Sequence, residues 1–269
     1  MFARFFDRSE FEPVEANLRE TLKFFSLAND NGEVVETDHL LLISSGINYG
    51  VFNTALLKTR VDSEDRLQSL ISEAHDYFGS RRERWSFWGC HDLLGPAVLR
   101  RLRRVMESRR MRLLSEPPGM SAGYLQPPRR TLPGLDVRPV IAPRDRLAFA
   151  GILSTTFDLP YTICVDMYAH ERSWSGGYRG WVGWVNGEPV VSTACVVSSN
   201  VIGVYSVGTM PAWRRRGYAE QLMRTVLNQL MIETGIERTI LQATTEGFRV
   251  YQKMGYRRVT QFSIFLMEP

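Results

Sequence analysis

The sequence predicts an α+β fold in which helices flank a central mixed β-sheet. Two short turns, Asn186-Gly187 and Ser199-Asn200, separate apolar runs of strand length, which is typical of antiparallel hairpins. These runs lie at residues 180–185, 189–198 and 201–209. After the third run, the pattern changes to long helix, strand, helix and strand, which is typical of parallel pairing. A sheet that contains both kinds of pairing is therefore expected.

A proline-rich stretch divides the chain. Residues 115–134 contain five prolines, which remove backbone donors and disfavour helix in the residue before each of them. We expect an irregular connection here, between a first domain at residues 1–130 and a second domain at residues 131–269.

Each domain has an ordered set of predicted elements. In the second, Pro143 opens a helix, and Gly235 closes the most regular helix of the chain, whose apolar residues recur at intervals of three and four from Ala219. Its other elements are expected at 136–141, 163–172, 239–243, 246–254 and 256–267. In the first, helices are expected at 15–27, 65–78 and 96–108, and strands at 39–44, 49–58, 84–90 and 111–114. The first domain thus resembles a shorter version of the second.

Composition and charge limit the function classes. The chain has 269 residues and a formal net charge of +4, a weak basic balance that does not indicate a nucleic-acid partner. No window has the roughly 18 apolar residues of a membrane span, so no membrane partner is expected. The widely spaced Cys90, Cys164 and Cys195 are typical of reduced thiols, which favours a cytoplasmic location. A homodimer is compatible with these features.

The clearest candidate site lies where the strand ending at Thr209 passes into the long helix. Gly217 and Ala219 leave space beside the first turn of this helix, whose amide N–H groups lack intrahelical partners. The run Arg214–Arg216 adds positive charge, so the segment is suited to bind a phosphate or pyrophosphate. From charge alone, the alternative is that three arginines only solvate the start of a helix.

These residues resemble the pyrophosphate loop of the GNAT superfamily of acyl-CoA-dependent N-acyltransferases. The family pattern is Gln or Arg, then Gly three positions later, then Gly or Ala, which reads Arg214-x-x-Gly217-x-Ala219 here. A second family motif is similar to the segment Tyr251-x-Lys253-x-Gly255-Tyr256. Because the two motifs occur in order with the expected elements between them, residues 136–269 are identified as GNAT-like, and the two domains as tandem GNAT-like modules.

The resemblance implies where acetyl-CoA, the co-substrate, binds. The strand would pair with the pantetheine arm, and the loop would enclose the pyrophosphate. The implied cofactor-binding residues are Val207, Gly208, Thr209, Arg214, Arg215, Arg216, Gly217, Tyr218, Ala219 and Glu220. The implied catalytic residue is Tyr251, whose phenol would protonate the departing thiolate, while a backbone N–H near Thr209 would polarise the thioester carbonyl. The alternative for Tyr251 is an aromatic side chain that packs a short helix.

The resemblance implies that the protein is an N-acetyltransferase. Such an enzyme transfers an acyl group to a primary amine of a small molecule or peptide, and the amine attacks the thioester directly in a ternary complex. The sequence does not identify the general base that would accept the amine proton. Candidates are Asp158, Asp166, His170, Glu188 and Tyr205. No histidine pair has metal-ligand spacing, so no metal is expected.

The first domain lacks an equivalent loop. The corresponding segment, Lys58–Asp65, contains no glycine and three acidic residues, which repel phosphate. Ser63 or Asp62 is expected to cap a helix there. We therefore expect residues 1–130 to form a degenerate GNAT-like module that does not bind coenzyme A in the same way.

Two other functions are left open by the sequence. One is a non-catalytic acyl-CoA-binding sensor or interaction module. The other is an aminoacyl-tRNA-dependent transferase, because some of these enzymes also use tandem GNAT-like halves. The loop at Arg214–Ala219 counts against the second, since it is suited to a coenzyme A pyrophosphate.

Overall fold

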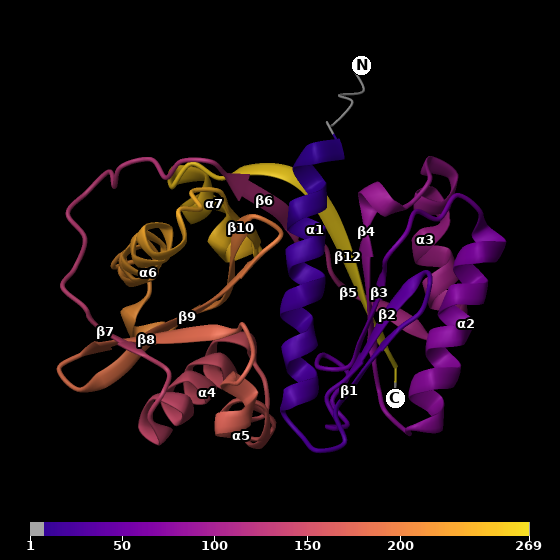
Figure 1. Ribbon diagram of the computed structural model, residues 1–269, viewed down its shortest axis with the longest axis horizontal. Coiled ribbons are helices and arrows are strands. Elements are labelled where there is room, and N and C mark those ends of the chain that lie inside the picture. Colours follow the sequence, from indigo (N-terminus) through magenta and orange to yellow (C-terminus); the bar gives the residue numbers. More distant parts are fainter. Residues whose placement is uncertain (1–7, 269) are drawn as a thin grey trace. The chain divides into compact units, whose positions relative to one another are not determined.

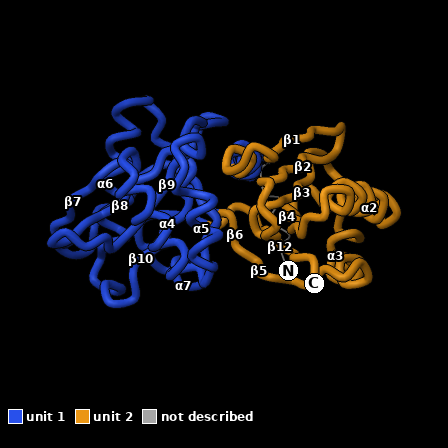
Figure 2. Tube along the Cα trace, turned by 90° about the horizontal axis from the view of Figure 1, so that it is seen from below, with its two compact units in different colours: residues 1–24, 120–257 blue, residues 25–119, 258–269 orange. Residues whose placement is uncertain are grey.

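A computed structural model describes residues 8–268 and divides the chain into two compact units. Unit 1 combines the chain up to Phe24 with Met120–Arg257, and unit 2 combines Phe25–Gly119 with the chain from Arg258 onward (Figure 2). The predicted division into residues 1–130 and 131–269 differs from these units at both ends. The physical reason is that helical periodicity marks which face is buried but not which partner buries it.

The sheet of unit 1 is mixed, as predicted. Its strand order is β6-β11-β10-β9-β8-β7, with antiparallel pairing from β7 to β10 and parallel pairing between β10 and β11. The strands are β6 (Pro118–Ala122), β7 (Asp136–Pro139), β8 (Arg179–Val185), β9 (Glu188–Ser198), β10 (Val201–Thr209) and β11 (Thr239–Gln242).

Helices cover both faces of this sheet. They are α1 (Arg8–Leu22), α4 (Pro143–Phe157), α5 (Tyr161–Tyr168), α6 (Tyr218–Thr234) and α7 (Thr245–Lys253). Helices α6 and α7 lie on one face, and α4 and α5 lie on the other (Figure 1). The central part of the apolar stripe of α6, from Leu222 to Leu230, is fully buried in the core with strand residues such as Ile202. As predicted, α6 ends at Gly235, whose φ is +70° and whose N–H donates to the Met231 carbonyl.

Helix α1 reaches unit 1 from the beginning of the chain. Asn17, which has no exposed surface, donates from Nδ2 to the Val196 carbonyl at 3.1 Å and to Ser198 Oγ at 2.8 Å. Its Oδ1 accepts the Tyr205 hydroxyl at 2.6 Å. A Cβ at Gly203 would lie only 1.9 Å from this Oδ1, so the close approach of α1 to β10 requires a glycine at that position. Helix α1 is therefore an integral part of unit 1.

Unit 2 also contains a mixed sheet. Its strands follow the order β1-β2-β3-β4-β12, with β5 also paired to β12, and β3 and β4 are parallel. The strands are β1 (Glu33–Glu36), β2 (Leu40–Ser44), β3 (Thr54–Leu57), β4 (Ser86–Cys90), β5 (Met111–Ser115) and β12 (Arg257–Met267), and the helices are α2 (Glu64–Ser80) and α3 (Pro96–Ser108). Apolar residues of α2 and α3 form a buried core with β2, β3 and β4.

Several predicted elements differ from those observed. The predicted strand 49–58 is extended only in β3, because Tyr49 and Phe52 donate to carbonyls two and three residues earlier and so form turns. The predicted irregular stretch 115–134 contains β6, which Pro118 can begin because a first strand residue tolerates the missing donor. The predicted helix 15–27 begins earlier and becomes a 3₁₀ helix after Leu22. Strand β1 was not predicted.

In the part of the chain that the structure describes, no helix has both the length and the apolar composition to cross a membrane.

Candidate active site

The parallel strands β10 and β11 separate partway along their length. They pair only at Ile202 with Thr239, Gly203 with Ile240 and Val204 with Leu241. Strand β10 continues to Thr209, whereas β11 ends at Gln242. Beyond Val204, the edge of β10 that faces β11 is therefore left for another hydrogen-bonding partner.

A β-bulge bends β10 at the point of separation. Between Tyr205 and Gly208, β10 advances three residues while β9 advances two, from Ala194 to Ser192. Ser206 has a positive φ of +52°, and its carbonyl accepts the Ser192 hydroxyl at 2.9 Å. The bulge thus fixes β10 to β9 while its other edge parts from β11.

The start of α6 lies directly after this strand. Gly217 is the N-cap, with a φ of +97°, and it has no side chain to accept the amides of the first turn. The first bond of the helix joins the Gln221 N–H to the Gly217 carbonyl at 2.9 Å. The preceding N–H groups of the first turn, from Tyr218 to Glu220, are therefore oriented for an external acceptor.

Two of the three arginines before Gly217 are held by neighbouring groups. Arg214 donates from Nε to the Thr209 carbonyl at 3.0 Å, which joins the loop to the end of β10. The Arg216 guanidinium lies over the Trp213 ring, 5.3 Å from its centroid. Tyr218 packs on the same Trp213 ring at 5.5 Å. The loop therefore has a defined shape, in addition to any solvation of the helix start.

The remaining cofactor-binding candidates lie on the same two elements. Val207 and Ala219 are partly buried against the core of unit 1, and Gly208 is buried next to α4, where a Cβ would lie 2.5 Å from Thr156 Oγ1. Arg215 is exposed, with a φ of +62°. Glu220 forms an ion pair with Arg224 at 2.8 Å, so the charge of its carboxylate is balanced within α6.

Tyr251 lies on α7, in the core that also contains Tyr218. Its side chain is 8% exposed, and its ring packs over Gly247, where a Cβ would lie 2.7 Å from Tyr251 Cε2. Burial raises the pKa of Tyr251 above its ordinary value. The phenol therefore keeps its proton throughout the physiological pH range and can act as a proton donor.

The structure does not single out a general base. Asp158, Asp166, His170 and Glu188 are all exposed. Tyr205 donates its hydroxyl proton to Asn17, and burial raises the pKa of Tyr205, so this phenol is a poor proton acceptor at neutral pH. Within residues 8–268, no group of three or more His, Cys, Asp and Glu side chains is placed to hold a metal ion.

The parallel strands of unit 2, β3 and β4, do not stay apart as β10 and β11 do. Beyond their paired residues, the segments that follow the two strands bond to each other. Val61 donates to the Leu93 carbonyl and accepts from the Gly95 N–H, each at 2.8 Å. Ser63 caps α2 by accepting the Arg66 N–H at 3.2 Å, so of the two predicted caps, Ser63 and Asp62, the structure has Ser63. The space between these strands is thus bridged by backbone hydrogen bonds.

Two contributions to unit 1 were not predicted from the sequence. Asn17 falls in the predicted first domain but bonds to Tyr205 of unit 1, and the segment around Arg130 was predicted to be a plain connection, although Arg130 Nη2 lies against Gly217. Local patterns carry no signal for either contact, because both join residues far apart in the sequence.

The separated parallel strands and the uncapped helix start together form a site that can pair with an extended ligand and bind an anion. Residues 149–256 match the model of the acetyltransferase (GNAT) family. Residues 149–256 therefore form a GNAT acetyltransferase domain, and this domain makes the protein an acyltransferase with an acyl-CoA co-substrate.

Solved structures share the fold at low sequence identity. A GCN5-related N-acetyltransferase from Kribbella flavida is 17% identical, with a TM-score of 0.67 over 94% of this chain and 96% of that one. A GCN5-related N-acetyltransferase from Sphaerobacter thermophilus is 16% identical, with a TM-score of 0.56 over 86% of this chain and 82% of that one. A comparison with curated protein sequences gives no match.

Proposed function

We propose that unit 1 transfers the acetyl group of acetyl-CoA directly to a primary amine. The observation that carries this proposal is the separation of β10 from β11 after Val204, beside the uncapped start of α6. The pantetheine arm is extended and contains amide groups, so it can pair with the open edge of β10 as a peptide adds to a sheet edge. The N–H groups at the start of α6 suit the phosphates of the same molecule.

The residues divide this work between strand and loop. The backbone of Val207, Gly208 and Thr209 holds the arm and supplies the N–H that polarises the acyl carbonyl. The segment Arg214–Glu220 holds the pyrophosphate through its backbone, and its arginines add positive charge. The Arg214 bond to the Thr209 carbonyl supports this division, because it fixes the loop relative to the strand.

The transfer needs one proton donor for sulfur. Acetyl-CoA supplies an acyl group activated as a thioester. The amine nitrogen forms a bond to the acyl carbon, the carbon–sulfur bond breaks, and the amine releases one proton to solvent. The Tyr251 hydroxyl gives its proton to the departing sulfur and is then reprotonated from solvent. The phenol is protonated before transfer, as a proton donor must be, although burial, which raises the pKa of Tyr251, also makes it a weaker acid than a free phenol.

We infer that unit 2 does not take up acetyl-CoA. The bridge between Val61 and Leu94 occupies the space that separated strands would leave, and Ser63 satisfies an N–H of the first turn of α2. One acetyl-CoA site per chain follows from this proposal.

An acceptor screen tests the proposed function. The protein is incubated with acetyl-CoA and a panel of small amines, amino acids, amino-group antibiotics and peptides with free N-termini. We expect thiol release in equal amount to an acetylated product, measured by mass spectrometry, for at least one class of amine. Calorimetric binding of acetyl-CoA without thiol release across the panel would instead favour an acyl-CoA sensor. Salt-sensitive binding of tRNA would favour an aminoacyl-tRNA-dependent transferase.

A further inference from the structure

We propose that Arg130 is a ligand for a phosphate group of the acyl-CoA, and that the linker between β6 and β7 forms the outer wall of the cofactor site. This inference rests on the proposed function of unit 1. It adds to that function a residue outside the strand and the loop that carry the GNAT motifs.

The linker first contacts the end of α7. The Gln126 N–H donates to the Met254 carbonyl at 2.9 Å. Gly255 has a φ of +103°, and a Cβ at this position would lie 2.9 Å from the Tyr124 carbonyl oxygen. From here the linker runs as a long loop past α6 to β7 (Figure 1).

The linker next contacts the start of α6. A Cβ at Gly217 would lie 3.1 Å from Arg130 Nη2, 3.3 Å from Pro133 Cδ and 3.4 Å from Leu132 Cδ2. The guanidinium of Arg130 is therefore at the turn that begins α6. Since α6 and α7 are the helices beside the separated strands, the linker spans the outer side of the proposed site.

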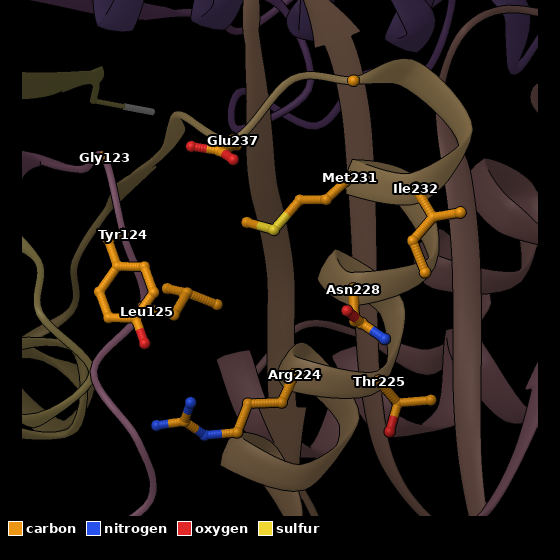
Figure 3. Close-up of a pocket in the computed structure, with 10 residues that line it drawn as sticks. Gly123, Tyr124, Leu125, Arg224, Thr225, Asn228, Met231, Ile232 and Glu237 are labelled. Carbon is orange, nitrogen blue, oxygen red and sulfur yellow. The ribbon is translucent and has the colours of Figure 1, made fainter.

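At its beginning, before Gln126, the linker stands away from α6. A groove of about 790 Å³ separates residues 123–125 from the helix. Tyr124 and Leu125 lie on one side of this groove, and Arg224 and Met231 lie on the other (Figure 3). The groove lies beside the middle and end of α6, whereas the Arg130 contact lies at the first turn of this helix.

The charges at this contact indicate an anion. Among residues 8–268, the Arg130 guanidinium has no ion pair or hydrogen bond. It lies at the positive end of the α6 dipole and follows the exposed Arg129, close in space to the loop that contains Arg214–Arg216. These like charges repel one another until an anion binds between them. Phosphate fits best, because a guanidinium and backbone N–H groups can both donate to its oxygens.

Calorimetric titration of two related ligands tests this inference. Coenzyme A and 3′-dephospho-coenzyme A are titrated at one ionic strength into the full-length protein and into the variants Arg130→Gln and Arg130→Lys. We expect Arg130→Gln to raise the Kd of coenzyme A about 10-fold, as for the loss of one charge-assisted hydrogen bond at an exposed site. Arg130→Lys should lose less affinity than Arg130→Gln, because lysine keeps the positive charge although it lacks the planar guanidinium. The control Arg104→Gln removes the same charge from an exposed position on α3 and should leave the Kd unchanged.

The two ligands identify the phosphate group. If Arg130→Gln loses affinity equally for both ligands, Arg130 is assigned to the pyrophosphate. If it loses affinity for coenzyme A alone, Arg130 is assigned to the 3′-phosphate. An unchanged or lower Kd for Arg130→Gln would overturn the inference while leaving the proposed function intact. If the unmodified protein binds neither ligand, the proposed function itself fails, and this inference fails with it.

Discussion

Replacing Gly217 with glutamate is expected to abolish measurable binding of acetyl-CoA. The φ of +97° at this position is unfavourable for any residue with a Cβ, and a Cβ would contact Arg130, Leu132 and Pro133 at 3.1–3.4 Å. The new carboxylate would also repel the pyrophosphate at the helix start. We expect the Kd, measured by calorimetry, to rise about 100-fold or more, which corresponds to about 3 kcal/mol.

The other end of the same helix provides a matched control. Gly235 is the C-cap of α6, with a φ of +70°, and nothing lies within 4 Å of a Cβ built there. Gly235→Glu introduces the same charge and a similar backbone strain, about 1–2 kcal/mol, at the end that the cofactor does not use. Its Kd should match that of the unmodified protein. Equal binding by Gly217→Glu and Gly235→Glu would refute the pyrophosphate loop.

Replacing Tyr251 with phenylalanine is expected to lower kcat about 100-fold or more, since positioned proton donors contribute on this scale. The change removes only a hydroxyl from a buried ring, so the fold and the affinity for acetyl-CoA should be retained. Because burial raises the pKa of Tyr251, ionisation of this phenol should cause no fall in kcat of the unmodified enzyme up to about pH 9. Steady-state kinetics as a function of pH, with the acceptor found in the screen, measure both effects.

Tyr256 provides the control for this prediction. Its ring is buried 6.0 Å from that of Tyr251, so Tyr256→Phe removes the same atom from the same core. We expect kcat to stay within about twofold of the unmodified value, well below the loss expected for a proton donor. Turnover by Tyr251→Phe equal to that of Tyr256→Phe would show that sulfur is protonated by another group.

Local sequence patterns predicted the elements that position the site. The hairpin turns at 186–187 and 199–200 placed β8, β9 and β10 within one residue of their observed bounds, because turn residues and alternation act over a few positions. The glycine at 217 and the periodic helix after it predicted the N-terminus of α6. The site residues themselves stay predictions until a ligand is bound.

Long-range contacts could not be predicted in this way. Packing of α1 on β10 depends on the fit of Asn17 against Gly203, and the closed strands of unit 2 depend on Val61 meeting Leu94. Strand β6 was not predicted, because the prolines around Pro118 indicated an irregular segment. Proline is excluded from the interior of a strand but not from its first position, where Pro118 lies. Such features arise from tertiary packing, which single-chain periodicity does not encode.

Amide hydrogen exchange with and without coenzyme A tests the location of the cofactor site most directly. Binding between the separated strands predicts slower exchange at Val207–Thr209 and at Arg216–Glu220, with no change in the segment Lys58–Ser63 of unit 2. Protection confined to unit 2, or unchanged exchange at both segments of unit 1 when the ligand is bound, would contradict the account.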